Sequence, residues 1–357
     1  MSRHDADLVV LGAGPVGLAV AVEAATAGLS VVVADPRSGP TDKACGEGLM
    51  PGARRALARL GVEPAPGADA MAFRGIRYLS PGHVVSADFR AGPGLGVRRT
   101  ALSQALGARA AAVGVRRVAV RAGPPRQDRD GVDVAGLRAR WCVAADGLHS
   151  PTRRALGLDA PRPAAGAARD PRARFGLRRH YLTAPWSEHV DVLWARDAEA
   201  YVTPVAPDVV GVAVLTCRPG DLDRQLAAFP GLQARLAGVP HASATRGAGP
   251  LRQRAVRVRA GRVLLAGDAA GYVDALTGEG ITVGLATARL AVACVLADDA
   301  RDYDRRWRAV SRDYRVLTEG LLLASSSPVL RRALVPAAER LPWAFRAAVD
   351  RLAAVHP

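Results

Sequence analysis

The sequence predicts an α/β fold, in which a parallel sheet flanked by helices carries an inserted antiparallel sheet and ends in further helices. Three observations support this fold class. Short apolar runs at 8–11, 141–145 and 263–266 each lead into a glycine or an aspartate and then a helical segment, as in parallel α/β sheets. The middle of the chain alternates apolar and polar residues, as strands do, and its last 30 residues are amphipathic with a helical period.

The composition limits the classes of protein to consider. The 357 residues, 49 % of them hydrophobic, can form one large domain or two closely joined ones. The formal net charge of +16 comes from arginines scattered among alanines and aspartates, with Lys43 the only lysine, so we expect no nucleic-acid partner. The four cysteines are far apart, without a CxxC pair or a histidine cluster, and no run of 18 apolar residues occurs. We expect a reduced, cytoplasmic protein without a metal site.

The first 35 residues have the pattern of a strand, a helix and a second strand. The expected strands are 8–11 and 30–34, and the helix between them runs to about residue 27. Gly12 permits the tight turn, Gly14 lets the backbone approach a pyrophosphate, and Gly17 lets the helix pack closely on the strand. Asp35 ends the second strand, where a carboxylate can accept the ribose hydroxyls of an adenosine. The expected contacts of this Rossmann-type dinucleotide site are Gly12, Ala13, Gly14, Pro15, Gly17 and Asp35, and the motif leaves NAD(P) and FAD open.

Two later aspartates lie at the ends of further strands. Asp146 follows the run at 141–145, and Gly267-Asp268 follows the run at 263–266, before a long helix that begins near 278–281. If these strands share one parallel sheet, both acids point toward the same ligand edge. With "GAGPVG", "KACGEGLMP", "ADGLHSPTR" and "GDAAGYVDALTGEGI" in this order, the chain resembles the FAD-dependent monooxygenases of the para-hydroxybenzoate hydroxylase fold. It resembles in particular the branch that these enzymes share with geranylgeranyl reductases.

The resemblance implies a noncovalent FAD and a role for several residues. It places Asp146 where flavin and nicotinamide meet, and Gly267 and Asp268 at the ribityl and pyrophosphate part of FAD. It makes Arg99, which opens "RRTALSQAL", a further FAD contact, with Arg98 as the alternative in register. The helix start at Gly278, Gly280 and Ile281 offers backbone N–H groups that stabilise an anionic reduced flavin.

The segment "DKACGEGLMPG" holds the lone lysine. In the related flavoproteins the matching loop lies beside the flavin ring, so we expect Gly46 to allow close approach and Cys45 to touch flavin or substrate. A lysine among arginines is either a chance survivor of codon bias or a place that needs a compact cation. We predict that Lys43 contacts FAD phosphate, reduced flavin or a substrate oxyanion, and we take Lys43 and Cys45 as the catalytic candidates.

The rest of the chain is divided around this site. We assign 1–70, 95–165 and 255–300 to a discontinuous FAD-binding domain, 71–94 and 166–254 to a substrate-binding sheet, and 301–357 to C-terminal helices. A hairpin is expected around 206–208. Tyr201, Thr203 and Pro204 on this sheet can line the substrate pocket, although a core or edge role fits each of them better. The same alternatives stay open for Tyr181, Trp186 and Trp194. The basic C-terminal stretch fits either packing on its own domain or peripheral contact with a membrane surface.

No second GxGxxG motif occurs, so we expect NAD(P)H to act as a transient reductant without a domain of its own. The sequence favours a single-component monooxygenase that hydroxylates or epoxidises a lipophilic phenol, polyketide or isoprenoid. The alternative is a C=C reductase of the geranylgeranyl reductase type. A third class is a redox-silent flavoprotein that serves as a binding or cyclisation scaffold. Neither the substrate nor the oligomeric state follows from the residues.

Overall fold

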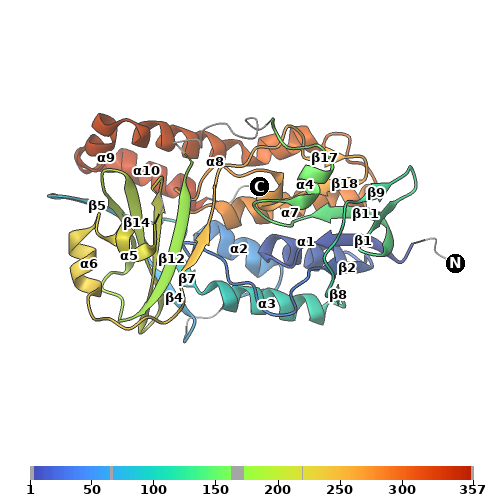
Figure 1. Cartoon of the computed structure of the whole chain (residues 1–357), viewed down its shortest axis with the longest axis horizontal. Helices are drawn as coiled ribbons and strands as arrows, with labels where there is room; N and C mark the ends of the chain where they lie inside the picture. The colour runs from blue at the N-terminus through green and yellow to red at the C-terminus, as the bar shows by residue number, and fades with distance from the viewer. Residues whose placement is uncertain (1–3, 65–66, 162–172, 219, 355–357) are drawn as a thin grey trace.

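The computed structural model describes residues 4–64, 67–161, 173–218 and 220–354. Two large sheets lie at opposite ends of an elongated molecule, and the C-terminal helices run along one side of both (Figure 1). The element order and the two sheets confirm the predicted fold class.

The first sheet is built around parallel strands. The order across it is β17-β18-β11-β1-β2-β8, and β8, β2, β1, β11 and β18 run parallel to one another. β9 and β10 extend β11 as an antiparallel hairpin, and β17 pairs antiparallel with β18. The bounds are β1 Ala6–Leu11, β2 Val31–Ala34, β8 Arg116–Val118, β9 Arg126–Gln127, β10 Val132–Val134, β11 Leu137–Ala144, β17 Arg259–Ala260 and β18 Val263–Leu265.

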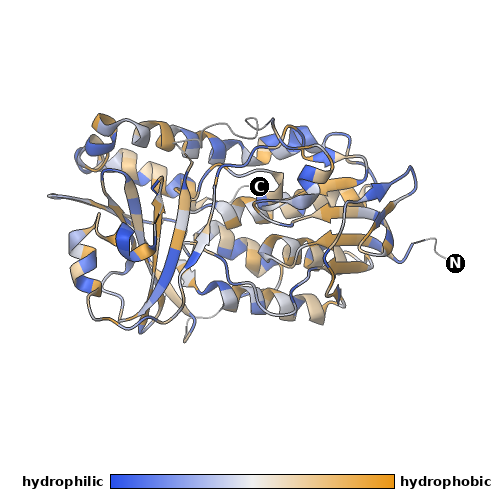
Figure 2. Ribbon diagram, viewed as in Figure 1, coloured by the Kyte–Doolittle hydropathy of each residue, from blue (hydrophilic) through white to orange (hydrophobic). Residues whose placement is uncertain are grey.

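Helices cover this sheet because its strands are apolar on both faces, as the orange strands in Figure 2 show. α1 packs against both α3 and α7. The bounds are α1 Pro15–Thr26, α2 Pro51–Arg59, α3 Arg99–Ala112, α4 Pro151–Ala155 and α7 Gly280–Leu296, with a 3₁₀ turn at Gly267–Ala270.

The second sheet has the order β16-β12-β15-β14-β13-β5-β6 and is antiparallel except where β5 and β13 run parallel. β14 and β15 form the predicted hairpin, turned at Pro207 and Asp208. One face packs against the short helices α5 and α6, and the other against α9 and α10. The bounds are β5 Gly75–Ser80, β6 His83–Asp88, β12 Phe175–Leu182, β13 His189–Trp194, β14 Ala198–Ala206, β15 Val209–Thr216, β16 Arg246–Ala248, α5 Leu222–Leu226 and α6 Pro230–Leu236.

A small antiparallel sheet lies between the two large ones. β7 (Gly94–Val97) pairs with β3 (Gly48–Leu49) on one side and with β4 (Ala70–Phe73) on the other, and β4 and β7 contact β14. Within the segment 71–94, β5 and β6 therefore join the second sheet, whereas β4 pairs with β7.

Three helices close the chain: α8 (Tyr303–Ser326), α9 (Pro328–Arg340) and α10 (Pro342–Ala353). Arg331 of α9 is only 7 % exposed and reaches into the second sheet, where its guanidinium donates to the carbonyls of Ala195 and Ala198 and pairs with buried Glu199. The helix is thereby held on the sheet by an ion pair as well as by apolar contacts. None of the helices in the described ranges is both long and apolar enough to cross a bilayer.

Candidate functional site

The acids predicted to share one ligand edge do lie together. Leu11 is in register with Ala34 on one side and with Ala144 on the other, and Ala144 is in register with Leu265. The residues that follow these positions therefore leave the sheet at the same edge, as the carboxyl ends of parallel strands do. Those residues are Gly12, Asp35, Asp146, Gly267 and Asp268.

The three glycines of the first turn differ in what surrounds them. Gly12 has a φ of +100°, and a Cβ there would lie 2.6 Å from the Ala145 carbonyl oxygen. A Cβ at Gly17 would lie 1.9 Å from the Gly12 carbonyl oxygen, so Gly17 lets α1 pack on the turn. A Cβ at Gly14 would meet no atom within 4 Å. Gly14 therefore leaves open space at the start of α1, where the N–H groups and the dipole attract a phosphate.

Asp35 lies at the end of β2 with a side chain only 3 % exposed. It accepts hydrogen bonds from the Ala13 N–H and from the N–H, Nε and Nη2 of Arg37, each 2.8 or 2.9 Å long. Burial would raise the pKa of Asp35, but these donors hold the pKa below its ordinary value. Four hydrogen bonds fill the lone pairs of one carboxylate, so a ribose hydroxyl has to displace the half-exposed Arg37 side chain.

The two carboxylate oxygens of Asp146 have different surroundings. Oδ2 accepts the N–H of Thr152 in the first turn of α4, at 3.0 Å. Oδ1 is buried and has no hydrogen-bond partner in the described protein. A buried acceptor without a donor is costly, and a hydroxyl of a bound ligand can satisfy it.

Asp268 is paired with the lone lysine. Lys43 Nζ lies 2.9 Å from Asp268 Oδ2, across 225 positions of sequence. Burial would raise the pKa of Asp268, but Lys43, with Arg99 and Arg153 farther away, holds the pKa below its ordinary value. The Arg153 guanidinium also donates to the Ala269 carbonyl at 2.9 Å, which fixes the turn that carries Asp268. The structure thus joins the predicted catalytic lysine to a predicted FAD-binding acid.

The loop that holds Lys43 is fixed by Glu47, which was not among the predicted site residues. Glu47 has a φ of +58°, a conformation that costs a non-glycine residue about 1–2 kcal/mol. Its Oε1 accepts the Arg99 N–H at 2.8 Å and its Oε2 lies 2.5 Å from His180 Nε2. The Arg178 guanidinium, which can only donate, lies 3.2 Å from His180 Nδ1, so Nδ1 accepts and Nε2 donates to Glu47.

Further contacts hold the same loop against the second sheet. The carboxylate of Asp42 pairs with Arg178 and Arg246, and the Gly46 carbonyl accepts the Thr203 hydroxyl at 2.8 Å. Cys45 is half-buried within this segment, and its Sγ accepts the Glu47 N–H at 3.4 Å. The second sheet therefore positions Lys43 and Cys45. Only the glycines on either side of Glu47 hinted at its role, and no signal marked His180.

The two arginines at the start of α3 lie in different surroundings. Arg98 pairs with Asp69 at 3.3 Å, whereas Arg99 is one of the charges that lower the pKa of Asp268. The Nε atoms of both arginines are buried without a hydrogen-bond partner in the described residues. Arg99 is thus closer to the acid predicted to bind FAD.

The start of α7 meets the loop of Lys43 through a methionine. Gly278 has a φ of +70°, and a Cβ there would lie 3.2 Å from the Met50 methyl group. The helix begins at Gly280, with Ile281 next to it, and no side chain caps its N-terminus. Its first backbone N–H groups are therefore available to an acceptor.

The aromatic residues of the second sheet divide between its faces. Tyr201 donates to the Leu276 carbonyl at 2.8 Å, and the ring of Trp194 lies 5.5 Å from that of Tyr78, on the face toward α9 and α10. Tyr181 and Trp186 lie in the cluster on the opposite face, with α5 and α6. The Pro204 carbonyl oxygen packs closely on Gly96 of the small sheet, where a Cβ would lie only 1.8 Å from it.

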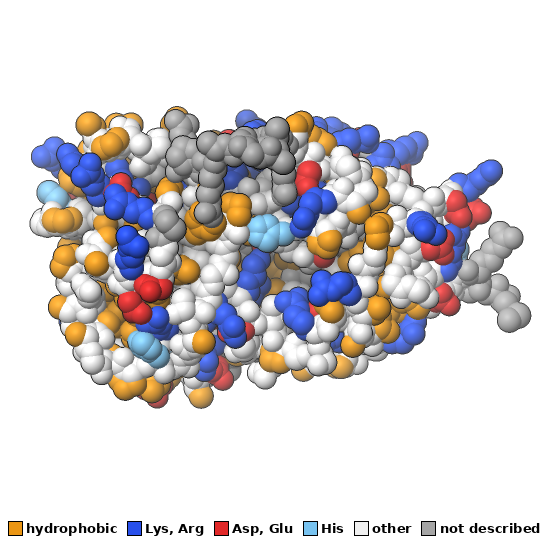
Figure 3. Space-filling model, in the orientation of Figure 1, with side chains coloured by type: hydrophobic (Ala, Val, Ile, Leu, Met, Phe, Trp, Pro, Cys, Tyr) orange, Lys and Arg blue, Asp and Glu red, His pale blue; other side chains and the backbone are white. Residues whose placement is uncertain are grey.

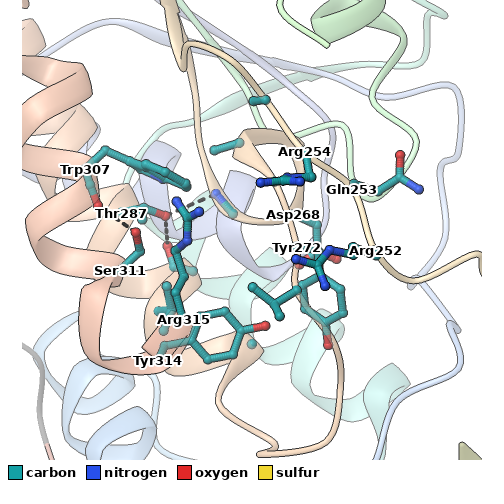
Figure 4. A pocket seen from close by; sticks show the side chains of 18 of the residues that line it. Arg252, Gln253, Arg254, Asp268, Tyr272, Thr287, Trp307, Ser311, Tyr314 and Arg315 are labelled. Carbon is teal, nitrogen blue, oxygen red and sulfur yellow. Dashed lines mark hydrogen bonds between the residues drawn. The ribbon is translucent and has the colours of Figure 1, made fainter. Parts of the chain in front are cut away.

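A pocket opens beside the Gly267–Asp268 turn, between α7, α8 and residues 252–255 (Figure 4). Arg252, Arg254 and Arg315 line it; Arg252 lies 3.2 Å from Glu319, and Arg315 lies over the Trp307 ring. Two acids also line the pocket, but Asp268 is paired with Lys43 and Glu319 with Arg252. The charges of Arg254 and Arg315 therefore make the pocket suited to an anionic group. Its aromatic walls are Tyr272, Trp307 and Tyr314.

Comparisons with known proteins agree with this geometry. The model of the FAD binding domain family matches residues 5–170. The chain is 33 % identical over 346 residues to the menaquinone reductase of Mycobacterium tuberculosis, covering 88 % of this chain and 81 % of that protein. The chain belongs to the FAD-dependent oxidoreductases of the para-hydroxybenzoate hydroxylase fold.

Other relatives of this FAD-dependent oxidoreductase carry different names. Digeranylgeranylglycerophospholipid reductase 1 of Methanopyrus kandleri is 29 % identical, covering 86 % of this chain and 87 % of that protein. Rifampicin monooxygenase of Streptomyces venezuelae is also 29 % identical, covering 78 % and 61 %. Among solved structures, the flavin-dependent brominase Bmp2 superimposes with a TM-score of 0.80 over 99 % of this chain and 94 % of that one. At 16 % identity it supports the fold alone.

The residues present fit FAD. The open space at Gly14, the buried Oδ1 of Asp146 and the uncapped start of α7 offer a phosphate cradle, a hydroxyl acceptor and an anion site along one edge. Arg37 has to move before a ribose hydroxyl can reach the Asp35 carboxylate, because it donates three hydrogen bonds to that carboxylate.

Proposed function

We propose that this FAD-dependent oxidoreductase reduces a C=C bond in the polyprenyl chain of a lipophilic substrate such as a quinone. The observation that carries the proposal is the similarity to two groups of reductases over more than four fifths of the chain. A menaquinone and a digeranylgeranyl lipid differ in their head groups and share an unsaturated polyprenyl chain. An activity common to such substrates therefore acts on the chain rather than on the head group.

Reducing an isolated C=C bond adds one hydride and one proton. The hydride is the chemistry that a reduced FAD would supply if held by the start of α1 at Gly14, by Asp146 and by the start of α7. The proton has to come from a side chain or from water. The candidates in the loop that holds Lys43, beside Asp268, are the Cys45 thiol and the Lys43 ammonium. The contacts of Glu47 and Asp42 with the second sheet hold this loop still, so that a donor in it keeps its position.

The surroundings of the site suit an apolar chain and an anionic reductant. Met50, whose methyl group lies next to Gly278 before α7, and Leu276 belong to one apolar cluster with Val335 and Phe345 of the C-terminal helices. The arginines of the pocket beside Asp268 suit the phosphates of NAD(P)H, which we propose as the transient reductant.

The test uses purified protein with FAD, NADPH and a menaquinone that carries an unsaturated side chain, under strict anaerobiosis. A product heavier by 2 Da, with the change in the side-chain fragment of its mass spectrum, supports the proposal. The similarity to rifampicin monooxygenase makes oxygen insertion the second candidate. A product heavier by 16 Da that forms only in air, with no anaerobic product, would overturn the reductase proposal in favour of it.

A further inference from the structure

Exposed apolar side chains are concentrated on the C-terminal helices. Leu323 and Val329 are each 73 % exposed and Trp343 is 70 % exposed. Of the large apolar side chains that are exposed in the described residues, more than half lie between positions 316 and 343. Such a concentration on one part of a surface marks a site of interaction rather than the scattered apolar residues of an ordinary surface. The set is Val316, Leu323, Val329, Leu330, Leu341 and Trp343.

The helical positions place these side chains on outward faces. Val316 and Leu323 are seven residues apart on α8 and therefore on the same face. On α9, Val329 is exposed while Arg331 and Val335 are buried on the opposite side. α9 packs against both α8 and α10, and the three helices lie along one side of the molecule (Figure 1).

The same surface is positively charged. The five acids of these helices are each paired with a basic side chain: Asp304 with Arg257, Asp313 with Arg351, Glu319 with Arg252, Glu339 with His83, and Asp350 with Arg90. Among the exposed arginines of the helices that make no ion pair within the described residues, four lie at positions 312–346, around the apolar set: Arg312, Arg332, Arg340 and Arg346. Figure 3 shows basic and apolar side chains intermixed at the end of the molecule where α9 and α10 lie. We call the six apolar residues and these four arginines the C-terminal face.

We propose that the C-terminal face docks the protein peripherally on the surface of an anionic lipid bilayer. Apolar side chains that enter the interfacial region and arginines that pair with anionic headgroups are the combination by which helices lie on membranes. A second copy of this chain fits less well, because an isologous contact would bring the four unpaired arginines of each copy together.

The position of the C-terminal face would bring the proposed active site close to a lipophilic substrate in the bilayer. The inner sides of α9 and α10 pack on the apolar cluster that continues to Met50 and Leu276 at the flavin edge. The helices that would dock therefore share one apolar cluster with Met50 and Leu276, where a lipophilic chain would react. This role of the docking rests on the proposed function, but the docking itself is measured without substrate or turnover.

The experiment is sedimentation of the full FAD-loaded chain with large vesicles of phosphatidylcholine alone and of phosphatidylcholine with 30 % phosphatidylglycerol. We expect binding to the anionic vesicles that is at least tenfold stronger than to the neutral ones and is weakened by salt. The triple variant Leu323→Ser/Val329→Ser/Trp343→Ser and the triple variant Arg332→Gln/Arg340→Gln/Arg346→Gln should each bind at least tenfold more weakly. The matched control, Leu182→Ser/Leu296→Ser, removes apolar side chains of 48 % and 49 % exposure elsewhere and should bind like the wild type.

Circular dichroism and FAD content show that each variant is folded. Quenching of tryptophan fluorescence by brominated acyl chains should disappear in Trp343→Phe. No sedimentation of the wild type, or equal loss in the control variant, would overturn the proposal. A wild-type dimer in light scattering that the apolar triple variant converts to a monomer, without vesicle binding, would assign the face to a second copy instead. Vesicle binding without any reductase activity would leave the docking standing and count against the proposed function alone.

Discussion

Replacing Gly14 by alanine should leave the apoprotein folded and weaken FAD binding at least about tenfold. The backbone at Gly14 has φ −74° and ψ 173°, an extended conformation that alanine adopts freely, and a new Cβ meets no protein atom within 4 Å. The cost to folding is then limited to the poorer helix cap, less than about 1 kcal/mol. The methyl group would instead occupy the space through which the pyrophosphate approaches the first N–H groups of α1. A tenfold loss of affinity corresponds to about 1.4 kcal/mol.

Gly17→Ala, by contrast, should lower the stability of the apoprotein itself. Its Cβ would lie 1.9 Å from the Gly12 carbonyl oxygen, about 1 Å closer than such atoms normally approach, so α1 has to shift away from the turn. Overpacking of this kind costs roughly 1–3 kcal/mol or more of unfolding free energy. Gly231→Ala, at an equally open glycine of α6, is the matched control and should neither weaken FAD binding nor lower the unfolding free energy.

The assays are urea unfolding of the apoprotein followed by circular dichroism, and titration of FAD followed by quenching of its fluorescence. Gly14→Ala with wild-type FAD affinity would show that the start of α1 does not hold the pyrophosphate. Gly17→Ala with wild-type stability would refute the packing argument.

The remaining predictions concern charged side chains. Asp268→Ala should weaken FAD binding roughly ten- to hundredfold, since one charged hydrogen bond contributes about 1.5–3 kcal/mol; an unchanged dissociation constant in a folded variant would remove Asp268 from the site. Lys43→Arg should slow substrate-dependent NAD(P)H oxidation at least about tenfold, which corresponds to a loss of about 1.4 kcal/mol of transition-state stabilisation. Wild-type rates in both Lys43→Arg and Lys43→Ala would show that the lysine has no role in the reaction. Arg331→Met should lower the unfolding free energy in urea by on the order of 3 kcal/mol, because it leaves one of the two buried carboxylates near Arg174 uncompensated; a change below about 1 kcal/mol would contradict this. The folded pKa of Asp35 is lowered, so its contribution to stability is complete above its ordinary pKa of about 3.9 and is lost as the pH falls through the folded value. Apoprotein stability should therefore decline below about pH 4, and Asp35→Asn should flatten that slope.

The FAD-binding edge could be predicted from the sequence because every part of its pattern is local. An apolar run, a glycine turn and an acid identify the end of a buried strand without knowledge of its neighbours, and parallel pairing then brings Gly12, Asp146 and Asp268 to one edge. The predicted strands differ from β2 and β11 by only a few residues at their starts. The β14–β15 hairpin was predictable for the same reason.

The contacts that hold the site could not be predicted, because they join residues far apart in sequence. His180 and Glu47 are 133 positions apart, and nothing in "LRRHYL" distinguishes a histidine that positions a loop from one on an exposed strand. Arg331 sits in a stretch rich in arginines, most of them exposed, and only the packing of α9 on β14 turns it into a buried partner of Glu199. Composition does not reveal which of many similar residues a tertiary contact selects.

The structure gives the lone lysine a physical reason to differ from the arginines around it. The Arg178 guanidinium donates to the Lys43 carbonyl at 3.3 Å and pairs with Asp42, so the backbone of this loop is fixed from the second sheet. From that fixed backbone, the Lys43 ammonium lies 2.9 Å from Asp268, and the lysine side chain stays 33 % exposed. Arginine is longer and carries a planar fork of donors, and it would engage both oxygens of Asp268 and project past it. The compact ammonium contacts only Oδ2 of Asp268, so the other oxygen can still accept a hydroxyl of the cofactor. A guanidinium bound to both oxygens would occupy that position.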